Sequence, residues 1–286
     1  VEMQARGKAI YKKLKKIMDG ERPDVIVCTH PICVKAIASY KEKTGLKVPL
    51  VTCITDISMH PEWTAPQTDI YLAPTQEIKR HLMKEGTRAE DILVTGIPVR
   101  QQFLDMDYCQ KREKNRTRRV LIMGGGLGQM PDLKELLEKL HSMQGVESVV
   151  MTGKNHKIYE EWVNRYEDVE VLGYTENISR YMRGADLVIT KAGGITLFEI
   201  LHSQVPLFVI HPFLEQEMNN ARYAAEKGFA KVVWGRHEDY IPELEKLLSD
   251  EKMMKEMTEN VRRACKEMIE VSLDEAVGIM EERMTA

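Results

Sequence analysis

ADLVITKAGGITLFEIL, residues 185–201, is the stretch from which the architecture of this chain is most readily inferred. Residues 187–190 are a short apolar run that predicts a buried strand, and a helix is predicted to begin at Ile195 or Thr196. The turn between them, residues 191–194, ends in two glycines. Adjacent glycines permit backbone angles that residues with a Cβ resist, and they let a ligand approach the main chain. A strand, a glycine turn and a helix in this order indicate a parallel α/β domain.

The turn and the helix after it have the features of a pocket for a nucleoside diphosphate. The first turn of a helix carries unpaired N–H groups, which suit a phosphate. Gly193 and Gly194 leave room beside those groups, and Thr196 adds a hydroxyl donor. Glu199 lies one turn further along, where a carboxylate can accept two hydrogen bonds from a ribose diol. The alternative, that the glycines only connect two elements, stays open because most such turns do only that.

Composition bounds the class of protein. The chain has 286 residues, enough for one large or two ordinary domains, and its 43% hydrophobic content predicts a globular protein with sizeable cores. The formal net charge of −3 argues against bulk nucleic-acid binding. Five cysteines without a CxxC pair or metal-ligand spacing favour a reducing compartment and predict no metal site. No apolar run approaches the length of a membrane span.

Strands and helices alternate along the chain, which predicts parallel βαβ units with helices on both faces of each sheet. Residues 108–119 are rich in charge and poor in apolar residues, and we interpret them as a linker. The sequence therefore predicts two Rossmann-like domains, residues 1–107 and 108–286. The expected strands lie at residues 24–30, 48–55, 69–73, 92–95, 119–123, 146–152, 170–172, 187–190, 206–210 and 230–234.

Glycine or polar residues follow the strands of the second half, so permissive backbone is expected along one rim of its sheet, as a nucleotide cleft requires. The glycine run at residues 124–128 is not GxGxxG with a downstream ribose acid, which argues against NAD. It also lacks GxxxxGK[ST], so a P-loop of the usual form is excluded.

DISMHPEW, residues 56–63, follows a predicted strand in the first half. Asp56 or His60 can act as a general base, and Trp63 can pack against a sugar or a lipid glycerol. In the alternative interpretation this is a surface loop, in which Asp56 caps the next turn and Trp63 anchors the loop. His30, also at the end of a strand, is a weaker candidate because a turn-capping histidine explains it equally well.

Two further polar segments allow two interpretations each. Gln216, Glu217 and Asn220 lie where a strand passes into a helix, and amides and carboxylates there suit sugar hydroxyls. Glutamate near a helix N-terminus is favourable in any case, so helix-start chemistry is the alternative. The helix predicted near the start of the chain has a basic outer face, which is either a solvated surface or a contact for anionic lipid headgroups.

The motifs in their order resemble one family. They are TDISMHPEW (55–63), GIPVR (96–100), IMGGGLG (122–128), TGKN (152–155), LGYTENI (172–178), ITKAGGITLFEIL (189–201) and EQEMNNARY (215–223). This set resembles the glycosyltransferases that make monogalactosyl- and processive glucosyl-diacylglycerols, which are close to the N-acetylglucosaminyltransferase of peptidoglycan lipid synthesis. The resemblance covers about residues 23–257, most of the chain, and it is specific because the set is ordered.

The resemblance implies a GT-B fold, with two Rossmann-like domains and a cleft between them. It implies UDP-glucose or UDP-galactose as donor at the C-terminal domain, and diacylglycerol or another lipid as acceptor at the N-terminal one. The implied transfer is inverting, needs no bound metal and uses no cofactor besides the donor substrate. It also implies a peripheral protein at the cytoplasmic face of the membrane. The alternatives are a UDP-sugar epimerase, which shares this fold, and a UDP-sugar-binding module without transferase activity.

The resemblance also assigns roles by position. Asp56 and His60, with Trp63, are implied on the acceptor side, and either Asp56 or His60 is expected to serve as the base. A larger set is implied on the donor side. Gly193, Gly194 and Thr196 are implied to hold the diphosphate, and Glu199 the ribose. Gly173 and Tyr174 are implied to lie near the uracil, and Gln216 and Glu217 to contact the sugar, with Asn220 close by.

Three departures from the family pattern are visible. Ala192 stands where the family usually has proline, and Leu214-Glu215 stand where it has proline-glycine. The family's first strand, glycine-rich loop and catalytic histidine precede anything present here, so an incomplete N-terminal domain is expected. The last helix of the family packs back on the N-terminal domain. In this chain Leu273, Val277 and Met280 are expected to form the apolar stripe that makes this contact.

Overall fold

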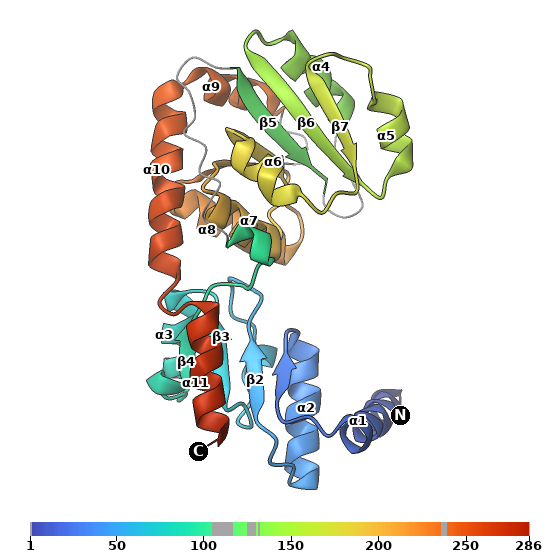
Figure 1. Cartoon of the computed structure of the whole chain (residues 1–286), viewed down its shortest axis with the longest axis vertical. Coiled ribbons are helices and arrows are strands. Elements are labelled where there is room, and N and C mark those ends of the chain that lie inside the picture. The colour runs from blue at the N-terminus through green and yellow to red at the C-terminus, as the bar shows by residue number, and fades with distance from the viewer. Residues whose placement is uncertain (1, 105–116, 125–129, 131, 236–238, 286) are drawn as a thin grey trace. The chain divides into compact units, whose positions relative to one another are not determined.

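The computed structural model describes residues 2–104, 117–124, 130, 132–235 and 239–285, and it is an α/β protein as the sequence predicted. The chain forms two compact units (Figure 1). Unit 1 comprises Val1–Pro98 and Met268–Ala286, and unit 2 comprises Val99–Glu267. The boundary therefore lies earlier than the expected one at residue 107. Most of the expected linker, and the glycine run at residues 125–128, lie outside the described residues.

Unit 1 is built on a four-stranded parallel sheet of order β1-β2-β3-β4. Its strands are β1 (Ile26–Cys28), β2 (Leu50–Cys53), β3 (Ile70–Ala73) and β4 (Ile92–Val94). Its helices are α1 (Glu2–Glu21), α2 (Pro31–Thr44), α3 (Gln76–Lys84) and α11 (Leu273–Thr285), with short 3₁₀ turns η1 (Pro61–Trp63) and η2 (Ala89–Asp91).

Successive side chains of a strand point to opposite faces of the sheet, and those of β2, β3 and β4 are buried on both faces, whereas Val27 of β1 is 53% exposed. On one face Leu50 and Tyr71 contact α2 and α3, and Trp63 of η1 lies in the same cluster. On the other face Val51 and Leu72 pack against α11. The expected return of the last helix to the first domain is thus correct.

Of the three residues expected in its contact stripe, Met280 packs on this face, whereas Leu273 and Val277 are not among the residues of the cluster. Ala276 is fully buried and Met280 packs beside it, but Val277 is 47% exposed and faces away from the sheet. The carbonyl of Val94 accepts hydrogen bonds from the N–H groups of Glu270 and Val271, and these bonds fix the start of the segment.

Unit 2 has a six-stranded parallel sheet of order β10-β9-β8-β5-β6-β7. Its strands are β5 (Arg118–Met123), β6 (Val146–Gly153), β7 (Val169–Gly173), β8 (Leu187–Thr190), β9 (Leu207–Ile210) and β10 (Ala230–Val233). Its helices are η3 (Gln101–Phe103), α4 (Leu133–Ser142), α5 (His156–Trp162), α6 (Ile178–Gly184), α7 (Gly194–Ser203), α8 (Glu215–Glu226), α9 (Ile241–Ser249) and α10 (Glu251–Met268).

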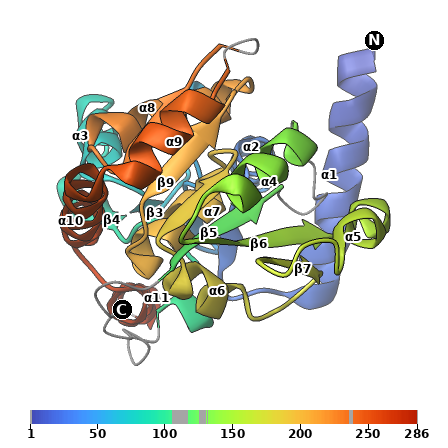
Figure 2. The ribbon, with the colours of Figure 1, turned by 90° about the horizontal axis from the view of Figure 1, so that it is seen from above.

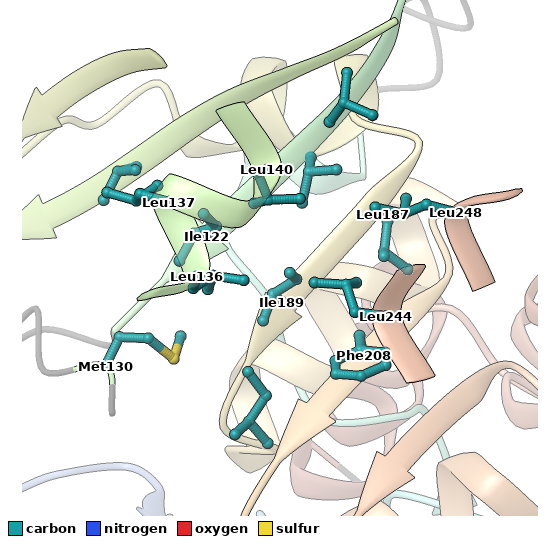
Figure 3. Packing of buried hydrophobic residues seen from close by; sticks show 14 of the residues in the cluster. Ile122, Met130, Leu136, Leu137, Leu140, Leu187, Ile189, Phe208, Leu244 and Leu248 are labelled. Carbon is teal, nitrogen blue, oxygen red and sulfur yellow. The ribbon is translucent and has the colours of Figure 1, made fainter. Parts of the chain in front are cut away.

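One face of this sheet is covered by α4, α5, α9 and the start of α10 (Figure 2). Figure 3 shows Leu136 of α4 near Ile122 of β5, and Leu244 of α9 near Ile189 and Phe208. Helices α6, α7 and α8 contact one another in sequence, and α6 also contacts β5. Strand order reverses between β5 and β8, so the carboxyl ends of these two strands form the topological switch point, where open α/β sheets bind ligands.

Gly228 follows α8 and is the glycine whose replacement is expected to damage the fold of unit 2. Its φ is +74°, and an added Cβ would lie 2.6 Å from Nδ2 of Asn260, which donates a hydrogen bond to its carbonyl. We expect Gly228→Ala to lower the free energy of unfolding by about 2 to 3 kcal/mol, through backbone strain and a displaced Asn260.

Urea denaturation measures this cost, and two other glycines serve as controls. Gly45→Ala has a similar φ of +70° without any atom within 4 Å, so it isolates the backbone strain at about 1 kcal/mol. Gly184→Ala has neither feature and is expected to be nearly neutral. Equal losses at Gly228 and Gly45 would show that Asn260 moves aside without cost.

Candidate functional site

The turn between β8 and α7 lies at the switch point of unit 2. The hydroxyl of Thr190 donates to the carbonyl of Met123 over 2.8 Å, which ties the ends of β8 and β5 together. The side-chain amide of Asn220, only 4% exposed, donates to the carbonyl of Ala192 over 2.7 Å. Asn220 was expected near the donor sugar. The structure shows it holding the turn from α8.

The first turn of α7 presents main-chain N–H groups beside this turn. The amides of Gly194, Ile195 and Thr196 have no hydrogen-bond partner within the described part of the chain. The N–H of Gly193 is already used, because it donates to the carbonyl of Lys191 over 2.8 Å. The amides available to an anion here are therefore those of residues 194–196, which include two of the three residues expected to hold the diphosphate, Gly194 and Thr196.

Two reasons were expected for glycine in this turn, unusual backbone angles and room for a ligand, and at Gly193 the structure shows the second. Gly193 is the N-cap of α7 with φ −70° and ψ 145°, which residues with a side chain adopt readily, and Gly194 is not among the glycines with positive φ. A Cβ on Gly193 would find only the Thr196 hydroxyl within 4 Å, at 3.8 Å. Open space beside the main chain, rather than an unusual backbone angle, is what Gly193 provides.

Glu199 lies on the next turn of α7 and is 4% exposed. Arg100 donates to its Oε1 from Nη2 over 2.8 Å and from Nε over 3.2 Å. Oε2 has no hydrogen-bond partner in the described residues. Burial raises the pKa of Glu199 above its usual value, and the hydrogen bonds and charge of Arg100 oppose that rise. No role was predicted for Arg100, although it stands at the end of the GIPVR motif.

Lys191 is a second basic residue at this site that the sequence analysis passed over. Its Nζ lies 5.7 Å from the centre of the Phe213 ring, and no carboxylate pairs with it among the residues that the structure describes. Because it stands in the turn itself, its charge adds to the attraction of the free amides for an anion. The sequence signal was a lysine in the turn, separated from the glycine doublet by Ala192.

The remaining predicted donor residues are spread along the same rim. Gly173 ends β7, which is separated from β8 by β5 and β6, about 14 Å at the usual strand spacing. Tyr174 is 68% exposed there. Gln216 is exposed at the start of α8, while Oε2 of Glu217 accepts from the N–H groups of residues 213 and 214, each over 3.3 Å. Glu217 thus has the helix-capping contacts that the alternative interpretation predicted.

The polar segment of unit 1 proves to be largely structural. Trp63 is 0% exposed, and its Nε1 donates to Oδ2 of Asp56 over 2.9 Å, so the expectation that its ring faces a ligand is wrong. His60 is the N-cap of η1, and its Nδ1 accepts from the N–H of Glu62 over 3.3 Å. Its side chain is nonetheless 61% exposed. His30 caps α2 in the same way.

The described residues contain no group of three or more histidine, cysteine, aspartate or glutamate side chains placed to hold a metal ion. None of their helices combines the length and the hydropathy needed to cross a lipid bilayer.

Comparison with known proteins identifies the chain. Residues 119–275 match the glycosyltransferase family 28 C-terminal domain. The chain belongs to glycosyltransferase family 28. In this family 28 chain, residues 3–99 in turn match monogalactosyldiacylglycerol (MGDG) synthase. The two matches together confirm the family resemblance seen in the order of the motifs.

Curated relatives agree with this assignment. The family 28 chain is 34% identical over 264 residues to a processive diacylglycerol beta-glucosyltransferase of Bacillus licheniformis, which covers 88% of this chain and 67% of the relative. It is also 34% identical over 260 residues to the protein of the same name in Bacillus subtilis, with the same coverage.

Solved structures show that the family 28 chain has the GT-B fold. MurG of Acinetobacter baumannii superposes with a TM-score of 0.66 at 14% identity, over 95% of this chain and 77% of that one. UDP-GlcNAc 2-epimerase of Neisseria meningitidis superposes with a TM-score of 0.61 at 14% identity, over 98% and 80%. At such identities these likenesses concern the fold alone, and a fold does not fix a function.

Proposed function

We propose that this protein transfers a hexose from a UDP-sugar to a membrane lipid such as diacylglycerol. The observation that carries the proposal is found at the switch point of unit 2. It combines the buried carboxylate of Glu199 with the amides of residues 194–196, which have no hydrogen-bond partner among the described residues. Membership of family 28 and the names of the Bacillus relatives support the reaction and the lipid.

In the proposed site the diphosphate lies against the amides of residues 194–196, with the Thr196 hydroxyl as a further donor. Departure of UDP develops negative charge, and helix-terminus amides aimed at that charge stabilise it. Lys191 adds a positive charge beside the same groups. Glu199 accepts from the ribose diol, Gly173 and Tyr174 line the uracil side, and Gln216 contacts the sugar.

The acceptor hydroxyl needs a base for its proton. Asp56 and His60 are the proposed candidates, and His60 is the more accessible because Oδ2 of Asp56 already accepts from Trp63. Attack from the face opposite the departing UDP inverts the anomeric centre, so the proposed product from an α-linked donor is a β-glycoside. We propose that this step needs no bound metal and no cofactor.

We further propose that the protein acts at the cytoplasmic face of a membrane as a peripheral protein. In α1, Lys12, Lys13, Lys15 and Lys16 are exposed, while Leu14 and Met18 pack on the core of unit 1. Exposed lysines near an anionic leaflet contribute on the order of 1 kcal/mol each to binding. The free cysteines Cys28, Cys33, Cys53 and Cys265 fit a reducing compartment.

The decisive experiment incubates the protein with UDP-glucose or UDP-galactose, radiolabelled in the sugar, and vesicles that contain diacylglycerol. Labelled glycolipid supports the proposal, and NMR of its anomeric proton tests inversion. Repeating the reaction with EDTA tests metal independence. An epimerised UDP-sugar without glycolipid would contradict the proposal and favour an epimerase, which shares this fold. Binding of UDP without turnover would indicate a binding module.

A further inference from the structure

We infer that Arg100 is a positioning residue of the nucleotide site, which fixes Glu199 by binding Oε1 and thereby leaves a charged Oε2 for the ribose. The inference rests on the proposed function, because it concerns the same donor site. It assigns to Arg100 a role through Glu199 rather than a contact with the nucleotide.

The segment that carries Arg100 is itself anchored. Arg100 is the N-cap of η3, and Phe103 of the same turn is 1% exposed. Gln102 donates to the carbonyl of Glu176 over 2.8 Å and accepts from the hydroxyl of Ser179 over 2.9 Å. Because these contacts hold η3 against α6 and the residues before it, the position of the Arg100 backbone is fixed.

From that place the guanidinium reaches Glu199 with two donors. Both bonds end on Oε1, at 2.8 Å and 3.2 Å, and the side chain of Glu199 is only 5% exposed while that of Arg100 is 46% exposed. This contact restricts the orientation of the Glu199 side chain, because the planar guanidinium holds the carboxylate through two hydrogen bonds. One oxygen is occupied, and the other is available to a ligand.

The charge of Glu199 depends on the same contact. A carboxyl group buried without a partner takes up a proton, since the ionised form is poorly solvated there. Arginine remains charged under all ordinary conditions, so it is a permanent counter-ion. Besides burial, Arg100 is the group that shifts the pKa of Glu199. On the neighbouring α6, Arg183 acts on His202 instead. Loss of Arg100 therefore raises the pKa of Glu199 further. A larger fraction of the carboxyl group is then protonated, and a protonated carboxyl group is a weaker acceptor for two ribose hydroxyls.

Titration calorimetry with UDP, and competition by uridine, test the inference on the whole chain. Arg100→Met is expected to weaken both ligands by the same factor, about 10- to 100-fold at neutral pH, because both contain the ribose. Binding to this variant is expected to strengthen as pH rises, since deprotonation restores the acceptor, and its midpoint is expected at higher pH than in the wild type. Arg100→Lys keeps a charge beside Oε1 and is expected to recover part of the affinity.

The double variant separates a positioning role from a direct one. If Arg100 acts through Glu199, Arg100→Met adds little to Glu199→Gln, so the two effects are not additive. Additive effects, or a loss for UDP with uridine unchanged, would mean that Arg100 contacts a phosphate and would overturn the inference. An Arg100→Met variant that binds as the wild type does would overturn it too, while leaving the donor site intact. A wild type without affinity for UDP would remove the donor site and this inference together.

Discussion

Gly193→Val is expected to weaken UDP binding by roughly 100-fold or more, about 3 kcal/mol, while unit 2 stays folded. The φ of −70° and ψ of 145° at Gly193 suit a β-branched residue, so the backbone tolerates the change. Its new side chain enters the open space beside the Thr196 hydroxyl, where only that oxygen lies within 4 Å of a Cβ. In the proposed site that space belongs to the diphosphate.

The affinity is measured by titration calorimetry and the fold by thermal unfolding. Glycine serves better than alanine or valine as an N-cap, so up to about 1 kcal/mol of stability is expected to be lost. Gly184→Val in α6 is the matched control, because a Cβ there meets no atom within 4 Å and the residue is remote from the turn. If the Gly193 variant bound UDP with full affinity, the proposal that the diphosphate lies at this turn would be wrong.

Trp63→Ala is expected to lower the free energy of unfolding of unit 1 by about 3 to 5 kcal/mol. The indole is 0% exposed within the cluster formed by β2, β3, α2 and α3, so its removal leaves a large cavity. The change also takes from Asp56 the donor that lies 2.9 Å from its Oδ2. Trp63→Phe, which keeps an aromatic ring and loses only the donor and part of the volume, is expected to cost less.

Guanidinium denaturation followed by circular dichroism measures this loss. Trp234→Ala is the matched control, because that indole is 42% exposed and its removal creates no cavity. UDP affinity is expected to be unchanged in the Trp63 variant under conditions where it is folded, since Trp63 belongs to unit 1 and the proposed donor site to unit 2. A cost below about 1 kcal/mol would contradict burial of the ring and restore the ligand-facing interpretation.

The fold could be predicted in outline because parallel strands buried on both faces appear as short apolar runs. Strand order could not be predicted. The position of the glycine turn at the switch point became visible only with the pairing of Met123 and Thr190. Arg100 was missed for a similar reason, since its partner Glu199 is 99 residues away in the chain. Spacing within a motif carries no information about such a contact.

The errors at single residues have local causes. Trp63 follows a strand and looked available to a ligand, but η1 turns it back against α2. The sugar contact predicted for Glu217 stays a prediction, and its carboxylate also accepts from two N–H groups at the start of α8. The glycine doublet was explained by backbone angles, whereas the structure shows ordinary angles and free space. In each case the residue type suits both a structural and a functional role, and the two roles can be distinguished only in the folded chain.

The return of the chain to unit 1 at Met268 has a consequence for synthesis on the ribosome. One sheet face of unit 1, with Val51 and Leu72, is covered by α11, which is encoded after the whole of unit 2. During translation unit 2 is therefore the first unit to have all of its residues. Until α11 has been synthesised, the apolar sheet face of unit 1 remains uncovered. That interval is when a nascent chain of this design is most in need of a chaperone.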